Sequence, residues 1–344
     1  MHCLPLLYHN PPNNAKFPKS PSLRYNIHEM SNLYDQLPQP FTALAPMEGV
    51  TDIAFRQVVA KAARPDLFYT EFTNVNSYVS EKGRANALER LRFEPSEQPI
   101  IPQLWGTVPA MFAETAAAVK SLGYHAIDIN MGCPDRHVVA TGGGSALIRT
   151  PDLAEEIIEA TKSANLPVSV KTRLGYTRPD EYETWLPTLL KHDLAALTIH
   201  LRTKKEMSKV SAHYELIPNI IHLRDQIAPK TKLILNGDFL NKTSAKPYFD
   251  QGANGVMIGR GVFQNPYCFS EVSVQKNTSD LFALLNYHLD LYEQYDLKPY
   301  DPLKRFYKIY INNFAGASDL RAHLMETKTI PEARAILTSF LAQS

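Results

Sequence analysis

The stretch Ala126–Pro134 reads AIDINMGCP, an apolar run that ends in Asn, Gly, Cys and Pro. The run predicts a strand over Ala126–Ile129, and Gly-Cys-Pro predicts a turn directly after it. A later segment, Asp152–Ala164, has the apolar spacing of an amphipathic helix and begins at a Thr-Pro-Asp start signal. The stretch therefore opens one β-then-α unit, and the repetition of this unit decides the fold.

The same alternation runs from Phe41 onward. The predicted strands are Phe41–Ala45, Leu67–Thr70, Ile100–Leu104, Ala126–Ile129, Val168–Lys171, Ala196–His200, Lys232–Leu235 and Gly255–Ile258. Segments with helical spacing, such as Ala110–Leu122 and Ser244–Gln251, lie between them. Eight such units predict an α/β fold, a (β/α)8 TIM barrel. A doubly wound sheet stays open, because periodicity alone does not prove closure.

The strand signals stop after about residue 277. The predicted helices that follow are Leu281–Gln294, Pro302–Phe314, Ala317–Glu326 and Ile330–Leu341. Residues 1–38 are rich in Pro, Asn and Ser and show no lasting period. The sequence therefore predicts three parts: a disordered or loosely packed extension (1–38), a barrel (39–276) and a small helical bundle (277–344).

Composition and charge exclude several classes of protein. The 344 residues include 36 Lys and Arg against 35 Asp and Glu, a net charge of +1, so a nucleic-acid partner would have to meet a local basic patch. The three cysteines, Cys3, Cys133 and Cys268, are too few and too scattered for a disulfide framework or a zinc site. We therefore expect a cytoplasmic protein without a metal, and the absence of a long apolar run predicts no membrane span.

Polar side chains follow seven of the predicted strands, at the edge where barrel enzymes build their active sites. One such residue would most often serve packing, but seven in the same phase predict a site. The stretches are Pro46-Met47-Glu48-Gly49, Gln103, Asn130-Met131-Gly132-Cys133-Pro134, Lys171-Thr172-Arg173, His200-Leu201-Arg202, Asn236-Gly237-Asp238 and Gly259-Arg260-Gly261.

Two of these stretches favour a phosphorylated ligand. Asn236–Asp238 and Gly259–Gly261 follow the seventh and eighth strands, where barrels commonly bind phosphate through backbone N–H groups. Arg260 adds a guanidinium that can pair with phosphate. Tight turns alone could also explain the glycines of either stretch, but the two together favour phosphate.

Three further side chains indicate a second part of this ligand. Gln103, Lys171 and His200 supply an amide and two cations for the edge of a heteroaromatic ring, so flavin mononucleotide (FMN) satisfies the whole pattern. The run Gly142–Ser145 does not complete a GxGxxG fingerprint, and no P-loop occurs. NADPH, if used, would dock transiently on a bound flavin.

Cys133 is the candidate for proton chemistry. A free cysteine is usually a buried inert thiol, but a Gly-Cys-Pro turn followed by the Gly-rich segment Thr141–Ser145 would present this one to a substrate. A thiol with a pKa of about 8.5 is mostly protonated at neutral pH and can act as a general acid or a nucleophile. Cys3 and Cys268 have no comparable setting and are predicted to be structural.

Five motifs, taken in order, carry a family resemblance. They are Ala45–Asp52 (APMEGVTD), Asp128–Pro134 (DINMGCP), Lys171–Gly175 (KTRLG), Thr198–Thr203 (TIHLRT) and Gly255–Gly261 (GVMIGRG). With them the chain resembles the tRNA-dihydrouridine synthases, from about Phe41 to the C-terminal helices. The resemblance implies an FMN-binding (β/α)8 barrel and a helical domain that helps to hold tRNA.

The resemblance also implies the reaction. NADPH or NADH first reduces FMN, and the C5=C6 bond of a uridine in tRNA is then reduced, with Cys133 as the proton donor and Asn130 at the uracil edge. The target nucleotide must leave its stack in the folded tRNA to reach the pocket. The implied cofactor contacts are Pro46, Met47, Glu48, Gln103, Lys171, His200, Asn236, Gly237, Asp238, Gly259 and Arg260.

Local basic residues are candidate contacts for tRNA phosphates, although each could equally belong to a solvated face. They are Arg136, Arg178, Lys204, Lys205 and Lys209 in the predicted barrel loops, and Lys304, Arg305, Lys308 and Arg321 in the helical region. We expect the protein to act as a monomer.

The chain departs from the family pattern after His200, where Leu201-Arg202-Thr203 stands for Gly-Arg-Thr and Val210–Tyr214 stands for Gly-x-Ala-Asp-Trp. Three rival functions stay open. They are an FMN barrel reductase of a free small molecule, as in dihydroorotate dehydrogenase, a Schiff-base aldolase that uses Lys171, and a non-catalytic RNA-binding protein. The helical C-terminal region argues against the first.

Overall fold

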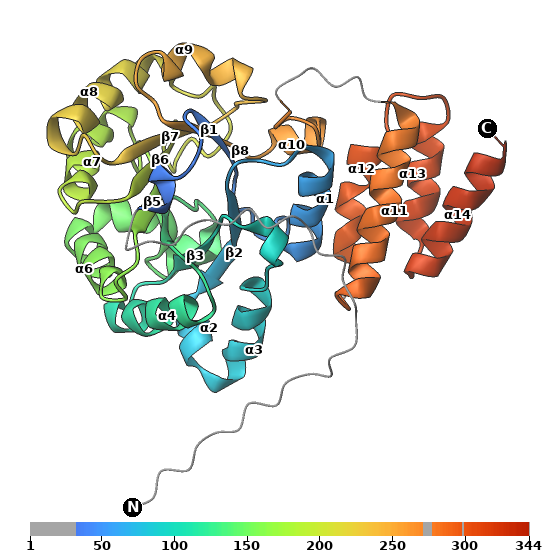
Figure 1. Cartoon of the computed structure of the whole chain (residues 1–344), viewed down its shortest axis with the longest axis horizontal. Helices are drawn as coiled ribbons and strands as arrows, with labels where there is room; N and C mark the ends of the chain where they lie inside the picture. The colour runs from blue at the N-terminus through green and yellow to red at the C-terminus, as the bar shows by residue number, and fades with distance from the viewer. Residues whose placement is uncertain (1–31, 271–276, 298, 344) are drawn as a thin grey trace, which may run out of the picture. The chain divides into compact units, whose positions relative to one another are not determined.

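The computed structural model describes residues 32–270, 277–297 and 299–343. Its centre is a sheet of eight parallel strands, and at least one helix follows each strand (Figure 1). The strands are β1 (Phe41–Leu44), β2 (Phe68–Asn74), β3 (Ile100–Trp105), β4 (Ile127–Met131), β5 (Val168–Arg173), β6 (Ala196–His200), β7 (Lys232–Asn236) and β8 (Gly255–Ile258). All eight predicted strands are confirmed, and β6 and β8 have the predicted bounds.

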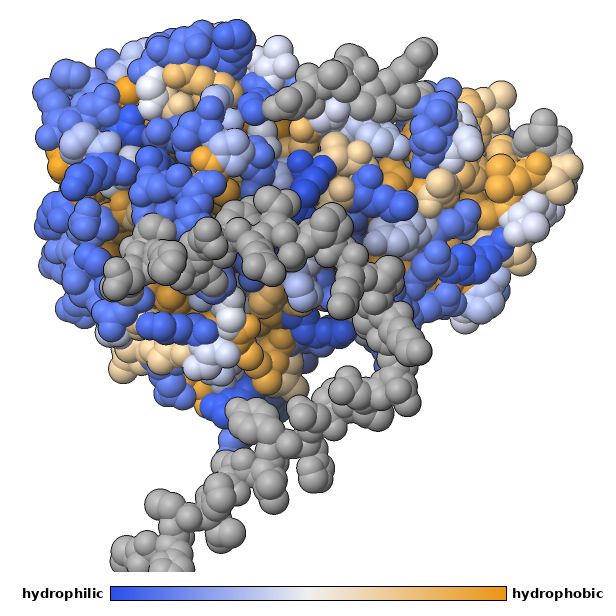
Figure 2. Space-filling view, in the orientation of Figure 1, coloured by the Kyte–Doolittle hydropathy of each residue, from blue (hydrophilic) through white to orange (hydrophobic). Residues whose placement is uncertain are grey.

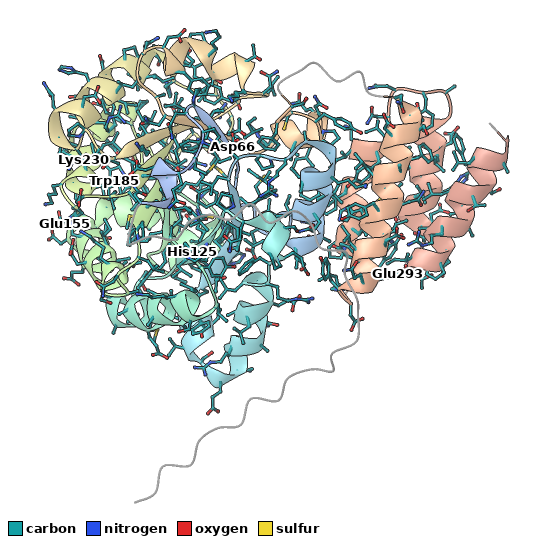
Figure 3. All side chains as sticks on the ribbon, in the orientation of Figure 1. Asp66, His125, Glu155, Trp185, Lys230 and Glu293 are labelled. Atoms are coloured by element: carbon teal, nitrogen blue, oxygen red, sulfur yellow. The ribbon has the colours of Figure 1, made fainter. Side chains whose placement is uncertain are left out.

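The sheet closes into a barrel. Its strand order runs β1-β8-β7-β6-β5-β4-β3-β2, and a parallel bridge between Ala43 and Leu67 joins the two ends. Asp66, labelled in Figure 3, strengthens this closure, because its Oδ2 accepts hydrogen bonds from the Thr42 backbone N–H at 2.7 Å and from the Thr42 hydroxyl at 2.9 Å. The TIM barrel is therefore confirmed, and the doubly wound sheet is excluded.

Helices surround the barrel, and local signals start several of them. The Asp52 carboxylate caps the first helix by accepting from the Phe55 N–H at 2.8 Å, and Pro109 and Pro151 occupy first-turn positions. The helices of the barrel are α1 (Ile53–Ala63), α2 (Val75–Val79), α3 (Glu81–Arg90), α4 (Pro109–Ser121), α5 (Arg136–Ala140), α6 (Pro151–Lys162), α7 (Tyr182–Leu190), α8 (Ile217–Ile227), α9 (Lys246–Phe249) and α10 (Gly261–Gln264). Its 3₁₀ helices are η1 (Leu33–Asp35), η2 (Pro95–Glu97), η3 (Gly144–Arg149), η4 (Pro179–Glu181), η5 (Tyr214–Leu216) and η6 (Thr243–Ala245).

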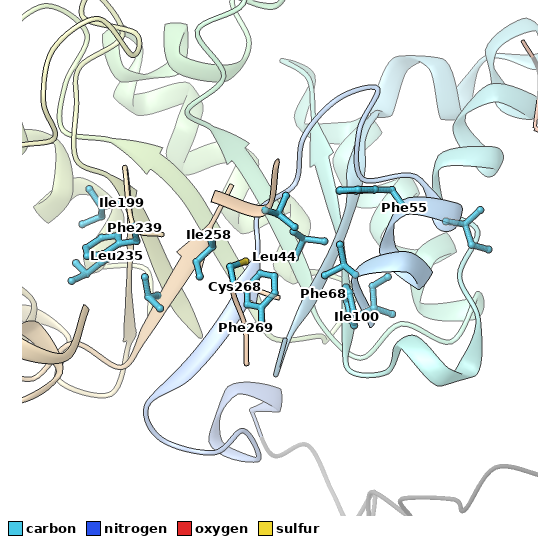
Figure 4. Packing of buried hydrophobic residues seen from close by; sticks show 14 of the residues in the cluster. Leu44, Phe55, Phe68, Ile100, Ile199, Leu235, Phe239, Ile258, Cys268 and Phe269 are labelled. Carbon is cyan, nitrogen blue, oxygen red and sulfur yellow. The ribbon is translucent and has the colours of Figure 1, made fainter. Parts of the chain in front are cut away.

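Buried apolar side chains form two clusters on opposite faces of the strands. The larger cluster packs strands against helices and includes Leu44, Phe68, Ile100 and Leu235, which Figure 4 shows in part. The smaller cluster fills the barrel interior. Most of its members stand next in sequence to those of the larger cluster, among them Ala43, Tyr69, Ile101, Ile234 and Met257. The alternation follows from the two-residue period of a strand. On the face shown in Figure 2, hydrophilic residues dominate over the helical ring.

Strand β5 carries this alternation into the polar part of the barrel. Val168 and Val170 belong to the outer cluster, so Ser169, Lys171 and Arg173 share the inner face. On the outer side, Trp185 of α7, labelled in Figure 3, donates its indole N–H to the Thr172 hydroxyl at 2.8 Å. The strand therefore points its cations inward while α7 covers its back.

The C-terminal region is helical, as predicted. It contains α11 (Thr278–Gln294), η7 (Asp301–Phe306), α12 (Tyr307–Tyr310), α13 (Ala317–Glu326) and α14 (Ile330–Gln343). The prediction of one regular helix over Pro302–Phe314 is wrong, because the chain forms η7 and the short α12 instead. Buried side chains recur there every three residues, the period of a 3₁₀ helix. They are Leu303, Phe306 and Ile309 in one row, and Lys304, Tyr307 and Tyr310 in the next.

Contacts with α1 and the loop before it join this region to the barrel. Phe55 of α1 stacks on Phe306 with ring centroids 4.6 Å apart. Arg305 donates from Nη1 to the Gly49 carbonyl oxygen at 2.6 Å. Gly49 has a φ of +67°, and a Cβ there would lie 2.9 Å from that nitrogen. The described residues from Asn32 onward form one compact unit, so the predicted boundary at 277 marks a change of element type within that unit.

The loose extension predicted for residues 1–38 is wrong for residues 32–38. Leu33, Tyr34 and Leu37 are buried, and the Tyr34 hydroxyl donates to Ser169 Oγ at 2.8 Å. This segment therefore packs against the interior end of the barrel, but its single turn of 3₁₀ helix is too short to give a periodic signal. Residues 1–31, with Cys3, lie outside the described residues. Among the helices that are described, none is long and apolar enough to cross a membrane.

Candidate active site

The turn after β4 holds Cys133 by its backbone. Asn130 Oδ1 accepts from the Cys133 N–H at 2.9 Å and from the Gly132 N–H at 3.1 Å. The Cys133 carbonyl accepts from Ser145, both from its N–H at 3.0 Å and from its hydroxyl at 2.9 Å. The thiol is partly exposed, and its burial raises the pKa of Cys133. A thiol in this setting is protonated at neutral pH and can give a proton to a substrate.

The Gly-rich segment behind the turn gives a first testable prediction. Gly144 has a φ of +56°, and a Cβ there would lie 2.8 Å from the Cys133 carbonyl oxygen. We expect Gly144→Ala to lower the free energy of unfolding by about 1–2 kcal/mol from the backbone conformation alone, and to displace the Cys133 turn as well. Urea unfolding and the rate of Cys133 alkylation measure the two effects.

Gly123→Ala is the matched control. Gly123 also has a positive φ, +91°, but nothing lies within 4 Å of its Cβ position. This variant should lose stability and keep the alkylation rate of the wild type. Equal alkylation rates in all three proteins would contradict the role given to Gly144.

Two cationic side chains of β5 and a histidine of β6 lie at the barrel mouth near Cys133. Burial and the Arg173 guanidinium lower the pKa of Lys171 to about 8, and burial lowers the pKa of Arg173 to about 10. Burial, followed by the charges of Arg173 and Lys171, holds the pKa of His200 well below its usual range, so this imidazole is neutral. The mouth therefore favours an electron-rich or anionic ligand.

Two buried nitrogen atoms at this mouth lack hydrogen-bond partners among the described residues. They are His200 Nδ1 and Arg202 Nη1. Arg202 is only 1% exposed. Its Nε donates to the Val210 carbonyl at 2.7 Å and its Nη2 pairs with Asp238, so Nη1 is the one nitrogen of this guanidinium without a partner among the described residues. Since buried polar atoms are normally paired, these two atoms indicate a polar ligand.

Asp238 brings the predicted phosphate residues together. Its carboxylate pairs with Arg202, and its Oδ1 lies 2.8 Å from Arg260 Nη2. Gly237 and Asp238 both have a positive φ, +125° and +56°, a conformation that Gly adopts freely and Asp tolerates. The turn after β7 therefore orients two guanidinium groups, of which Arg260 is 60% exposed and available to a phosphate.

Of the three predicted cofactor contacts in the loop after β1, two lie near the end of β8 and the third points to the rim. Pro46 is buried, and the Met47 sulfur lies 3.7 Å from the position that a Cβ of Gly259 would take. These two strand ends are therefore adjacent, as the predicted cofactor contacts require. Glu48 is exposed and pairs with Arg90 of α3, so it forms an ion pair at the rim.

Two predicted cofactor contacts bond within the barrel. Gln103 is fully buried, with Nε2 donating to Asp128 at 2.6 Å and Oε1 accepting from Asn130 at 2.8 Å. Asn236 donates from Nδ2 to the Met257 carbonyl at 2.8 Å. Each amide nitrogen keeps a second hydrogen, so the cofactor role of these residues stays a prediction. Asn130 was expected at the uracil edge, but its oxygen serves the Cys133 turn.

The basic candidates that were predicted in the barrel loops lie near the surface, with Arg136 as the first residue of α5. Arg136, Lys205 and Lys209 are exposed, and Arg178 is 70% exposed beside Asp180. Lys204 lies with Nζ 4.9 Å from the centroid of the Tyr176 ring, in the loop after β6. These positions are compatible with phosphate contacts, which stay predictions.

Of the four basic candidates in the helical region, three bond to groups of this protein. Lys308 is exposed, and Arg321 donates to the Ile311 carbonyl at 2.7 Å. Lys304 argues against its predicted role, because it is 8% exposed and Nζ bonds to the Met325 carbonyl at 3.0 Å and to Asp301 at 2.8 Å. Its period-three placement turns this ammonium inward. Arg305 is committed to Gly49.

The polar stretches predicted at the strand ends include Arg173 and Arg202, but neither was given a role, and Asp128 was not selected as a site residue. Arg173 and Arg202 stand two residues after Lys171 and His200, which is the spacing of the inner face and a signal that could have assigned them. Asp128 gave no signal, because an acidic residue inside an apolar run does not reveal its partners. No group of three or more His, Cys, Asp or Glu within the described ranges could hold a metal ion.

Fold and site together define a (β/α)8 barrel enzyme with a thiol and a cationic ligand site at its mouth. The sequence model of the dihydrouridine synthase family matches residues 43–343. The chain is 49% identical to a probable tRNA-dihydrouridine synthase 2 of Bacillus subtilis strain 168 over 90% of this chain and 96% of that protein. It is also 49% identical to a probable tRNA-dihydrouridine synthase of Staphylococcus aureus strain COL, over 91% and 96%.

This chain therefore belongs to the dihydrouridine synthase family. Among solved structures, histamine dehydrogenase from Rhizobium sp. 4-9 is similar with a TM-score of 0.49 and 12% identity, over 67% of this chain and 45% of that chain. A likeness at this level says nothing about activity.

Proposed function

We propose that this protein reduces the C5=C6 bond of a uridine in tRNA to give dihydrouridine. The observation that carries the proposal is Cys133, a protonated and partly exposed thiol beside the cationic mouth of the barrel. Membership of the dihydrouridine synthase family supports the reaction, and the names of the two relatives support tRNA as its substrate.

FMN is the proposed cofactor, and the residues at the mouth fit it. His200 and Lys171 would face the ring, and the guanidinium groups of Arg202 and Arg260, oriented by Asp238, would hold the phosphate. When bound, FMN supplies the hydride that the pyrimidine takes up at C6, after reduction by NADPH or NADH.

The side chains of the protein supply the remaining chemistry. As hydride addition builds negative charge on the uracil C5–C4=O system, the Cys133 S–H bond breaks and its proton goes to C5, which completes the saturation of the double bond. The positive charges of Lys171 and Arg173 stabilise the resulting thiolate and the developing enolate, because both carry their charge in a partly buried site.

Rival activities of the same site are less well supported. A reductase of free small molecules would need the same barrel and cofactor, but the alignments with the two relatives cover 90% and 91% of this chain, and the family model extends through the helical region to residue 343. A Schiff-base aldolase could use the lowered pKa of Lys171, but it would leave Cys133 and the phosphate-type arginines without a role. The expectations of a cytoplasmic monomer and of NADPH against NADH stay predictions.

The test uses the full chain, as purified, with tRNA from cells that lack dihydrouridine. We expect a yellow protein that releases FMN on denaturation and converts a uridine of tRNA when NADPH or NADH is present, as measured by mass spectrometry of nucleosides. Free uridine is the matched substrate, and its reduction should be negligible because the nucleotide is presented by tRNA. Equal reduction of free uridine would favour a small-molecule reductase, and a colourless protein trapped by borohydride would favour an aldolase.

A further inference from the structure

A chain of hydrogen bonds runs through the barrel interior from Asp128 to the Cys133 turn. Gln103 Nε2 donates to Asp128 Oδ2 at 2.6 Å, and Asn130 Nδ2 donates to Gln103 Oε1 at 2.8 Å. Asn130 Oδ1 then accepts from the backbone N–H groups of Gly132 and Cys133. Asp128 and Gln103 are fully buried and Asn130 is 5% exposed, so water does not compete for these bonds.

The direction of every bond in this chain is fixed by its two ends. Backbone N–H groups can only donate, so Asn130 must turn its oxygen toward the Cys133 turn and its nitrogen toward Gln103. Gln103 must therefore present its oxygen to Asn130 and its nitrogen to residue 128. The chain is complete only if residue 128 offers an acceptor.

A second branch reaches the same carboxylate from the opposite side. Ser169 Oγ donates to Asp128 Oδ1 at 2.6 Å, and the Tyr34 hydroxyl donates to Ser169 Oγ at 2.8 Å. This branch leads to the segment at residues 32–38, away from Cys133. Asp128 therefore receives donors from both branches, and the two can be broken separately.

We propose that Asp128 is a positioning residue that orients Cys133 for proton transfer, acting through Gln103 and Asn130. Without an acceptor at position 128, Gln103 loses the partner that fixes the orientation of its amide. Asn130 can then rotate away from the Gly132 and Cys133 N–H groups, and the turn that presents the thiol is released. The proposal rests on the function proposed above for Cys133.

The ionised form of Asp128 is accessible at mildly alkaline pH. Burial raises the pKa of Asp128 to about 6, and the hydrogen bonds from Ser169 and Gln103 and the charge of Lys171 oppose that effect. At pH 8 the group is therefore a carboxylate that accepts from the donors of both branches.

An asparagine at position 128 should rescue the chain. Its amide oxygen can accept from Gln103 while its nitrogen donates to Ser169 Oγ. Ser169 can then donate to the Ile127 carbonyl, which already lies 3.4 Å from its hydroxyl. Valine is shorter by one branching position and offers no acceptor.

The experiment compares Asp128→Val, Asp128→Asn and Ser169→Ala in the full chain at pH 8. Hydrogen exchange followed by mass spectrometry reports the Gly132 and Cys133 amides without tRNA, flavin or turnover. We expect exchange in the peptide that covers them to be at least about tenfold faster in Asp128→Val and close to wild type in the other two variants. In the reductase assay, Asp128→Val should lower kcat at least about tenfold and change KM for tRNA less than about twofold.

Several outcomes would overturn the proposal. One is wild-type exchange in folded Asp128→Val, and another is exchange in Ser169→Ala as fast as in Asp128→Val, which would indicate a general loss of packing. If Asp128→Val does not fold, Gln103→Met breaks the next link, and wild-type exchange in that variant is equally contradictory. Faster exchange in a protein whose wild type reduces no tRNA would leave the positioning role standing and refute the proposed function.

Discussion

Cys133→Ala should lower the rate of dihydrouridine formation at least about a hundredfold, because it removes the group that gives the proton to C5. The turn itself should survive, since the bonds that Asn130 and Ser145 make with residue 133 involve its backbone. We therefore expect unchanged flavin binding and unchanged thermal unfolding. The measurement is single-turnover reduction of tRNA that lacks dihydrouridine.

Cys268→Ala is the matched control for this variant. Cys268 is 1% exposed and belongs to the core between strands and helices (Figure 4). Truncating it should cost some stability and leave the rate per folded protein unchanged. A Cys133→Ala protein that reduces tRNA at the wild-type rate would refute the proton-donor assignment.

Arg56→Met should give the largest loss of stability among the substitutions considered, about 3–5 kcal/mol in the free energy of unfolding. Arg56 and Glu97 are 1% and 0% exposed, and their atoms Nε and Oε1 lie 2.7 Å apart. The same guanidinium donates to the carbonyls of Thr51 and Arg92 at 2.8 and 2.7 Å. Methionine fills most of the volume but removes the cation that pairs with the buried Glu97 charge, which then keeps, among the described residues, only the Glu94 backbone N–H at 2.7 Å.

Lys246→Met serves as its control, because the Lys246–Asp250 pair is 71% and 69% exposed with a separation of 3.5 Å. Exposed pairs contribute about 0–1 kcal/mol, so this variant should unfold close to the wild type in urea. A similar loss in the free energy of unfolding in both variants would show that burial does not account for the contribution of the Arg56–Glu97 pair to stability.

The strands were predictable because each one carries its own short-range signal. Apolar β-branched runs fix where β6 and β8 begin and end, and the predicted bounds hold there. β1 ends one residue earlier than predicted, and the other strands extend further toward their polar ends, as in β5, which continues to Arg173. Lys171, Thr172 and Arg173 break the apolar pattern, but the neighbouring strands still supply hydrogen-bond partners for their backbone.

The site was predictable only where a residue's type suffices to suggest its chemistry. Cys133 and His200 stand at strand ends and have reactive side chains, so position and type point the same way. Asp128 and Tyr34 matter because of partners far away in the sequence, and no local pattern encodes those pairs. Lys304 shows the opposite error, since a lysine suggests the surface until a period-three element turns it inward.

The bond from Arg305 to Gly49 has a practical consequence for exchanging parts between family members. A hybrid protein that combines this barrel with the C-terminal helices of a relative would need an arginine at the equivalent of position 305 and a glycine at position 49. A partner lacking either one would remove the bond that joins the C-terminal helices to the loop that carries Pro46 and Met47. The residue types at positions 49 and 305 therefore indicate whether a barrel and a set of C-terminal helices can form this contact.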